Sequence, residues 1–372
     1  MTTVFPPSRN ANALAPYDCP PADVPTPCLV VYEEALLHNL RMTAERCGGI
    51  ERLMPHIKTH RASWVVARLI EAGVRAFKVA TVTEARMVLD AGAPRVLWAY
   101  PTVNGHHLAS FLSLARQHPQ AVLGALIDSA QGLDAWRQAM GATTWPSNLS
   151  LHVDLDPGMG RTGAPIGPEA LSLARGAAAL GTLGTFGGWH VYDGHIHDRD
   201  IELRRGRVAE VAARLRAIVT KGRAGHGLSA EVIAGASYSF DLWPTDLATY
   251  VAPGSWAYSS DQHDIELAHL QWQPAAFVLA TVISRHGERV TLDAGAKAIS
   301  PDKLMADRFR WDSPIVMMNE EHVVVDGGSL AVGDRVMLLP RHACTTAYLY
   351  DQALVRTESG RWEIRAQLGS KR

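Results

Sequence analysis

The sequence has few cysteines and no secretory signal pattern at its start. The only cysteines among 372 residues are Cys19, Cys28, Cys47 and Cys344. The first residues, MTTVFPPSRNANALAPYDCPP, are rich in proline and lack the basic start and apolar core of a secretory signal. We therefore expect a cytoplasmic protein that keeps its cysteines reduced, so that a functional cysteine acts as a ligand or a nucleophile.

Long apolar runs and net charge are missing as well. No stretch of about 18 apolar residues occurs, which excludes a membrane-spanning helix. The net charge of -1 and the pI near 7.0 remove the electrostatic basis for binding nucleic acid or an anionic membrane. The chain is 47% hydrophobic, enough for a large core, and its length suits one barrel-sized domain plus a smaller one. We expect a small-molecule substrate.

Strand-like and helix-like segments alternate through the first two thirds of the chain, as in a parallel sheet. Amphipathic segments cover residues 34–47, 62–72, 83–91 and 200–221. No GxGxxG turn follows an early strand, so we predict a (β/α)8 TIM barrel over residues 26–259 instead of an open dinucleotide-binding sheet. The predicted strands are PCLVVY, RLMPHI, RAFKVA, RVLWAY, AVLGALI, LSLHVDL, GGWHVY and EVIAGA, with ATYVAP as a ninth candidate.

The pattern changes after about Ser260. Short alternating runs such as AAFVLATVISR, RVTLDAG, EHVVVDGG and DRVMLLPRHAC are separated by turns, and helix-forming runs almost vanish. We therefore predict a smaller C-terminal β domain over residues 260–372. Residues 1–25 form an N-terminal extension that we expect to pack on this β domain.

A lysine stands where barrel enzymes place reactive groups, at the C-terminal end of a strand. In the segment PHIKTH, Lys58 ends the second predicted strand. Partial removal of water lowers the pKa of such a lysine and frees its amine to attack a carbonyl. A lysine at a strand end is also a common surface charge, so Lys58 alone is ambiguous.

The later strand ends offer further polar groups. Arg161 lies on the glycine-rich loop DPGMGRTG after the sixth predicted strand, and Tyr192 and His195 end the seventh. The eighth ends in Gly235, Ala236, Ser237 and Tyr238, where small residues can close around a phosphate. Gly254 and Ser255 can complete that cradle, since phosphate sites in barrels commonly follow the late strands. Local capping and turn formation are the alternative explanation for each group.

The β domain contains the segment PRHACTT. If it is a strand, His342 and Cys344 point to the same face and can reach one ion together. Imidazole and thiolate favour zinc over magnesium or calcium. Two protein ligands leave positions open for water or substrate, as a catalytic site requires, although an HxC pair also occurs by chance.

These segments resemble the fold-type III pyridoxal-phosphate enzymes of the D-threonine aldolase and D-serine dehydratase group. The resemblance runs from about Thr26 to Asp351 and rests on PHIKTH and HAC, supported by TPCLVV, DPGMGRTG, YDGH, PGS and LDAGAKA. It implies that Lys58 carries pyridoxal phosphate as a Schiff base, with Arg161 near the phenolic oxygen and Tyr192 near the ring. The remaining implied features are a divalent metal (zinc or manganese) on His342 and Cys344, and a homodimer.

The motifs point to two related reactions. YDGH is similar to the aldolases and the HxC pair to the dehydratases, while GASYSF departs from the GGT-type phosphate loop of the aldolases. We predict retro-aldol cleavage of a D-β-hydroxy amino acid such as D-threonine to glycine and an aldehyde, with His195 as the base. The alternative is a dehydratase of D-serine or D-3-hydroxyaspartate, in which Lys58 removes the α-proton.

Two further functions remain open. An amino-acid racemase would need a second base, for which Tyr258 is the candidate, and would not need a metal pair. A non-catalytic binding barrel would follow if Lys58 is solvated and no cofactor binds.

Overall fold

The computed structural model describes the whole chain except residues 1–2, 7–16, 182–184 and 230. The chain divides into two compact units. The barrel unit comprises Ala44–Lys58 and Val65–Gly254, with Arg372, and the β unit comprises Met1–Thr43, Thr59–Trp64 and Ser255–Lys371. Among the described residues, no helix is long and apolar enough to cross a membrane.

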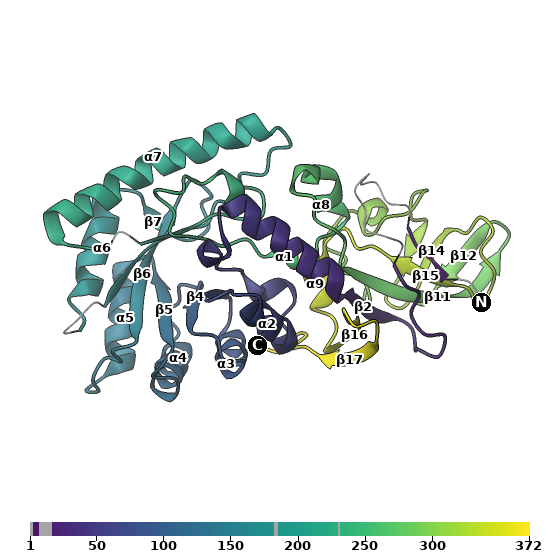
Figure 1. The fold of residues 1–372 in the computed structure, drawn as a ribbon, viewed down its shortest axis with the longest axis horizontal. Helices are drawn as coiled ribbons and strands as arrows, with labels where there is room; N and C mark the ends of the chain where they lie inside the picture. The colour runs from purple at the N-terminus through teal and green to yellow at the C-terminus, as the bar shows by residue number, and fades with distance from the viewer. Residues whose placement is uncertain (1–2, 7–16, 182–184, 230) are drawn as a thin grey trace. The chain divides into compact units, whose positions relative to one another are not determined.

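The barrel unit is built on parallel strands (Figure 1). A segment at residues 53–56 bridges both edges of this sheet, since Leu53 pairs with Val251 and His56 with Lys78. Within the described residues the strands therefore close into a ring of eight, which confirms the predicted barrel. In spatial order the strands are β3 (Phe77–Val79), β4 (Arg95–Trp98), β5 (Val122–Ile127), β6 (Leu149–Asp156), β8 (Phe186–Val191), β9 (Val232–Ala234) and β10 (Tyr250–Val251), with β7 (Ala164–Pro165) beside β6.

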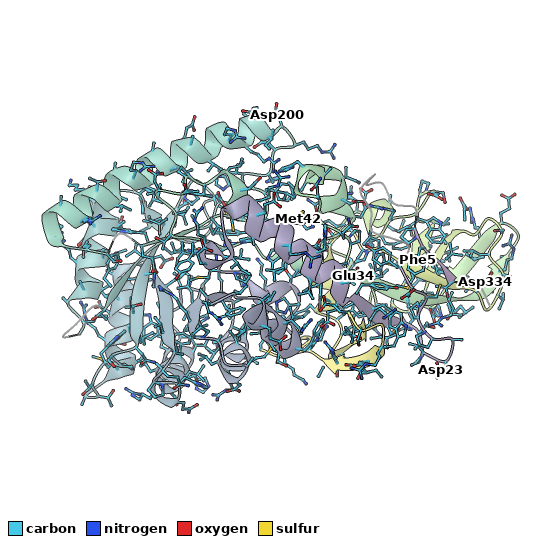
Figure 2. All side chains as sticks on the ribbon, in the orientation of Figure 1. Phe5, Asp23, Glu34, Met42, Asp200 and Asp334 are labelled. Atoms are coloured by element: carbon cyan, nitrogen blue, oxygen red, sulfur yellow. The ribbon has the colours of Figure 1, made fainter. Side chains whose placement is uncertain are left out.

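Helices follow the strands, and several of them begin at polar caps. The Asn104 and Ser129 side chains accept backbone N–H groups at the starts of their helices, and Asp200, labelled in Figure 2, does the same for the longest helix. These caps satisfy amides that the first turn leaves unpaired. The helices are α1 (Glu33–Cys47), α2 (Ser63–Glu71), α3 (Val82–Asp90), α4 (Gly105–Gln117), α5 (Ala130–Met140), α6 (Pro168–Ala178) and α7 (Ile201–His226).

The interior of the ring changes from apolar to polar along the strands. Met54, Ala76, Leu97, Leu126, Ile233 and Ala252 form one apolar cluster. His56 and Lys78 come two residues after Met54 and Ala76 in the sequence. They lie on the same face as those residues, because side chains on one face of a strand recur every second residue. Polar groups thus occupy the part of the ring nearest the C-terminal strand ends, where barrel enzymes carry their sites.

The first predicted barrel strand was assigned to the wrong sheet. The PCLVVY run forms β2 (Cys28–Tyr32), which pairs with β11 (Ala276–His286) and β16 (Gln352–Arg356) in the β unit. A run buried on both faces has the same pattern in either kind of sheet, so only its partners decide its place. The barrel predicted for residues 26–259 therefore starts after the PCLVVY run. The strand predicted as the second becomes the first strand of the barrel, and the number of each later strand decreases by one.

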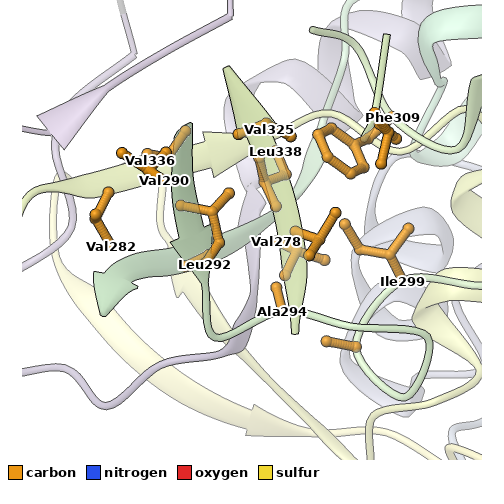
Figure 3. Packing of buried hydrophobic residues seen from close by; sticks show 14 of the residues in the cluster. Val278, Val282, Val290, Leu292, Ala294, Ile299, Phe309, Val325, Val336 and Leu338 are labelled. Carbon is orange, nitrogen blue, oxygen red and sulfur yellow. The ribbon is translucent and has the colours of Figure 1, made fainter. Parts of the chain in front are cut away.

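The β unit is a mixed sheet with a valine- and leucine-rich core. Its main path runs β13 (Met317–Met318), β14 (Val323–Asp326), β12 (Arg289–Leu292), β11, β2, β16 and β17 (Trp362–Ala366). β15 (Arg335–Leu338) pairs with β11 and with β1 (Thr3–Val4). Val278, Leu292, Val325 and Leu338 interdigitate in its core (Figure 3). Its short helices are α8 (Asp261–Glu266) and α9 (Ala343–Ala347).

The described part of the N-terminal extension contacts the β unit. β1 lies parallel to β15, with Thr3 opposite Arg335. The Arg335 guanidinium donates to the carbonyl of Pro21 at 2.6 Å, and the ring of Tyr17 packs edge-on against Phe277 at 5.1 Å. Part of the predicted extension, residues 1–2 and 7–16, lies outside the described residues.

Candidate active site

Three cations surround one tyrosine ring in the barrel unit. Lys58, in the short 3-10 helix Ile57–Thr59 after the bridging segment, has its Nζ 5.6 Å from the centre of the Tyr192 ring. Lys78 Nζ lies 5.4 Å and Arg161 Cζ 4.7 Å from the same centre. We call Lys58, Lys78, Arg161 and Tyr192 the Tyr192 cluster. Such contacts stabilise each cation, but three like charges also repel one another.

Lys78 carries the strongest electrostatic perturbation of the cluster. Its side chain is only 3% exposed. Burial, followed by the charge of Lys58, lowers its pKa to about 7, while the carboxylates of Asp154 and Asp193 act in the opposite direction. Lys78 therefore exchanges its proton near neutral pH, unlike a solvated lysine.

A buried histidine–aspartate pair lies beside Lys78. His190 Nδ1 is 2.6 Å from Asp154 Oδ1, and Thr162 Oγ1 donates to Asp154 Oδ2 at 2.9 Å. A carboxylate only accepts, so Nδ1 carries the hydrogen. Burial, followed by the charge of Lys78, lowers the pKa of His190 to about 4, so its ring is neutral at neutral pH. His190 Nε2 is buried and has no hydrogen-bond partner among the described residues.

The loop that carries Arg161 is held by one carboxylate. Asp156 Oδ1 accepts the backbone N–H groups of Gly158, Met159 and Gly160 at 2.9, 2.7 and 3.1 Å. Gly158 and Gly160 have φ values of 119° and 68°, which favour glycine. The DPGMGR sequence thus builds a rigid turn in front of the arginine.

The predicted base His195 lies against this loop. It is half-buried, and a Cβ built on Gly158 would be 3.8 Å from its Nε2. Its Nδ1 is buried without a hydrogen-bond partner among the described residues. His195 therefore has an unused ring nitrogen, which a proton-transfer group needs.

The predicted phosphate loop is anchored by a buried carboxylate. Asp193 accepts hydrogen bonds from Ser239 Oγ at 2.7 Å and Trp243 Nε1 at 2.9 Å. Gly235 has φ of 88°, and a Cβ there would lie 3.1 Å from Phe240 Cα, so only glycine fits. The turn continues through the half-buried Ser237 and Tyr238.

One feature of the predicted cradle differs from expectation. The Ala236 N–H donates to Ser239 Oγ at 2.9 Å, so this amide serves the loop itself. Backbone N–H groups of a loop rich in small residues often form hydrogen bonds within the turn itself. The composition of the loop does not reveal which N–H groups are left to bind a ligand.

His342 and Cys344 do not lie on a strand, contrary to the sequence prediction. His342 precedes α9 in an extended conformation, and Cys344 lies in the first turn of that helix. Residues i and i+2 diverge within a helix, but the extended backbone of His342 leaves the two side chains hydrogen-bonded to each other. The two side chains are thus close together, but they are carried by an extended residue and a helix instead of a strand.

The surroundings of this pair are polar. His342 Nδ1 is 2.5 Å from Asp302 Oδ2. Cys344 Sγ is 3.1 Å from Thr59 Oγ1 and 3.6 Å from Ser255 Oγ. Burial lowers the pKa of His342, but hydrogen bonding and attraction from Cys344 and Asp302 outweigh burial and raise it to about 9.

The pair is an incomplete donor set for a metal. No group of three His, Cys, Asp or Glu side chains suited to a metal occurs within the part of the chain that the structure describes. Because His342 Nδ1 is bonded to Asp302, Nε2 is the ring nitrogen that could coordinate a metal, and a carboxylate partner of this kind is common for zinc-bound histidines. A metal held by His342 and Cys344 would need further ligands from water or substrate.

Sequence reasoning missed Lys78, Asp154 and His190 as members of the site. All three interrupt apolar strand runs, RAFKVA, LSLHVDL and GGWHVY, near their C-terminal ends. A charged or polar residue in a strand buried on both faces needs a partner or a function. That signal was available in the sequence.

Two family models match the chain in succession. The model described as "Alanine racemase, N-terminal domain" matches residues 31–261. The model described as "Putative serine dehydratase domain" matches residues 275–356. The boundary between them follows the change of pattern near residue 260.

Known proteins match nearly the whole chain. It is 29% identical to a D-threonine aldolase from Arthrobacter sp, with 94% of each chain covered. It is 28% identical to a 3-hydroxy-D-aspartate aldolase from Paracoccus denitrificans, covering 89% of this chain and 88% of the relative. The crystal structure of D-threonine aldolase from Filomicrobium marinum superposes with a TM-score of 0.80 at 25% identity, covering 93% of this chain and 95% of that one. The chain therefore belongs to the alanine racemase N-terminal domain family and is close to D-threonine and D-3-hydroxyaspartate aldolases.

Proposed function

We propose that this protein is a pyridoxal-phosphate-dependent lyase that cleaves a D-β-hydroxy amino acid, such as D-threonine, to glycine and an aldehyde. The observation that carries the proposal is the Tyr192 cluster, in which a lysine at a barrel strand end shares an aromatic ring with two other cations. The aldolase relatives support the lyase class.

The residues of the barrel unit fit the cofactor. Family members use pyridoxal phosphate. Lys58 would hold it covalently through its amine, Tyr192 would contact its ring, and the loop from Gly235 to Tyr238 would face its phosphate. The excess of cations at Tyr192 and the unpartnered Nε2 of His190 suit an anionic, ring-bearing ligand. When bound, the cofactor supplies an electron sink for the bond that breaks at the substrate α-carbon.

The β unit offers a pair of metal ligands. We propose that His342 and Cys344 hold zinc or manganese, which would supply a Lewis acid for the substrate hydroxyl. Asp302 supports this role because it orients the His342 ring. Within the β unit, Thr59 Oγ1 lies 3.1 Å from Cys344 Sγ.

Proton transfer in this scheme falls to His195. Its ring takes the proton of the substrate β-hydroxyl, so the electron pair left on oxygen forms the aldehyde carbonyl as the carbon–carbon bond breaks. The unused nitrogen of His195 and the rigid neighbouring loop support this role.

Dehydration of D-serine or D-3-hydroxyaspartate is the second candidate. The match of residues 275–356 to a putative serine dehydratase domain favours it. In that reaction Lys58 would remove the α-proton, and the other groups would keep their positions. A racemase has less support: its candidate base Tyr258 is fully buried, which raises the pKa of the phenol and keeps it protonated.

The test is a product analysis. Purified protein with pyridoxal phosphate and Zn²⁺ or Mn²⁺ is incubated with D-threonine, D-serine and D-3-hydroxyaspartate, and products are identified by mass spectrometry. Glycine and an aldehyde, lost in Lys58→Ala and His342→Ala, would support the aldolase. Oxo acid and ammonia would transfer the assignment to the dehydratase. We also propose a homodimer, for which light scattering should give twice the chain mass of 40.4 kDa.

A further inference from the structure

The Tyr192 cluster has more positive than negative groups available to a ligand. Its three cations face two nearby carboxylates, Asp154 and Asp193. Asp154 already accepts hydrogen bonds from His190 and Thr162, and Asp193 accepts hydrogen bonds from Ser239 and Trp243. The barrel unit thus has a site with surplus positive charge, which an anion would stabilise.

Lys78 is the cation that the proposed function leaves without a role. Its amine makes no hydrogen bond or ion pair with any residue that the structure describes, although the side chain is 3% exposed. A buried ammonium without a partner is costly, so such a group is retained for a ligand or for chemistry. The backbone of Lys78 pairs with that of His56, which precedes Lys58 by two residues.

We propose that Lys78 is a further cofactor-binding residue, whose ammonium, together with Arg161, holds the negatively charged phenolic oxygen of pyridoxal phosphate. This inference rests on the cofactor assignment of the proposed function. In pyridoxal phosphate the ring carbon that bears this oxygen is next to the carbon that bears the carbonyl. The oxygen therefore lies beside the amine that binds the carbonyl. Lys58 and Lys78 both lie near the Tyr192 ring, Lys78 on β3 and Lys58 just after the segment that pairs with β3.

Ligand binding should then change the protonation of Lys78. Its pKa of about 7 in the free protein leaves most of the amine neutral at pH 8. An adjacent anion favours the ammonium, so binding draws a proton from solvent. The charged and titratable groups around Lys78 that set this balance are His56, Lys58, Asp154, Arg161, His190 and Asp193.

The test uses calorimetric binding of two cofactor analogues that cannot react with Lys58. One is 4′-deoxypyridoxine 5′-phosphate, which keeps the phenolic oxygen, and the other is its 3-O-methyl ether, which lacks the anion. Lys78→Met should weaken the first by about tenfold or more and leave the second nearly unchanged, because only the first offers a charged hydrogen-bond partner. Lys221→Met, at an exposed position on α7, is the matched control and should change neither affinity.

Proton uptake gives a readout independent of affinity. Titrations at pH 8 in buffers of different ionisation enthalpy should show uptake for the wild type that falls by close to one proton in Lys78→Met. Lys78→Arg should restore affinity for the first analogue without restoring the uptake, since arginine stays charged. Circular dichroism confirms that each variant is folded.

The outcomes separate this inference from the proposed function. Equal weakening of both analogues, or no weakening, would overturn the role of Lys78 while leaving the cofactor assignment intact. If the wild type binds neither analogue nor pyridoxal phosphate, the cofactor assignment itself fails and the role of Lys78 fails with it.

Discussion

Asp154 and His190 form a buried pair in the barrel, with Asp154 Oδ1 2.6 Å from His190 Nδ1. Removal of the carboxylate leaves the imidazole N–H buried without an acceptor. Asp154→Ala should therefore lower the free energy of unfolding by about 1–3 kcal/mol. Urea denaturation measures this change. Asp134→Ala, which breaks an exposed ion pair with Arg137, is the control and should cost less than about 1 kcal/mol. Equal effects of the two substitutions would contradict the importance of the buried pair.

Lys78 should make stability depend on pH. Its pKa is about 7 in the folded protein and near 10.4 when unfolded, so the unfolded state binds more protons between these values. Stability of the wild type should rise with pH in this window, since the penalty of the buried ammonium is fully present below pH 7 and is relieved above it. The stability gap between Lys78→Met and the ligand-free wild type should be largest at pH 6.5 and should shrink by pH 9. A constant gap would exclude a perturbed Lys78.

Lys58 should be required for covalent attachment of the cofactor. Lys58→Ala should abolish product formation and the visible absorbance of the attached cofactor, because no other amine would form that bond. Absorbance spectra of protein dialysed after loading with pyridoxal phosphate measure attachment. Persistence of the visible band in Lys58→Ala would assign attachment to another lysine, with Lys78 the first to examine.

The metal pair should depend on Asp302 as well as on its two ligands. His342→Ala and Cys344→Ser should each remove bound zinc or manganese, and chelation of the wild type should stop product formation. Asp302→Asn should weaken metal binding by about 10–100-fold through loss of the ring's orientation. Elemental analysis after dialysis measures occupancy. Cys19→Ser, at an exposed cysteine, is the control; metal retained in all variants would refute the site.

Gly235 should be irreplaceable in the loop after β9. Gly235→Ala adds a Cβ 3.1 Å from Phe240 Cα at a φ of 88°, so we expect a loss of about 1–3 kcal/mol in stability and weaker cofactor binding. Gly206→Ala is a useful contrast, because that glycine lies within α7 with open space around its Cβ position. It should stabilise the protein by up to about 1 kcal/mol. Thermal unfolding of both variants measures the change in stability, and cofactor titration measures the change in affinity.

Much of the barrel was predictable from local pattern. The runs RAFKVA, LSLHVDL and GGWHVY form β3, β6 and β8, and the amphipathic segment at residues 200–221 forms the N-cap and most of α7. These predictions hold because a buried parallel strand and an amphipathic helix each impose their own hydrophobic period. The position of Lys58 after a barrel strand was predictable for a similar reason, since it follows from the order of the elements.

The sequence by itself determined most elements of the barrel, the barrel class and the family motifs at Lys58, His342 and Cys344. Tertiary structure alone decided that β2 joins the β unit, because backbone pairing between distant segments leaves no local pattern. It also decided that Lys78, Arg161 and Tyr192, from three separate segments, meet at one ring. Closure of the strands brings these positions together, and burial then shifts the pKa of Lys78, an effect that exists only once water has been excluded.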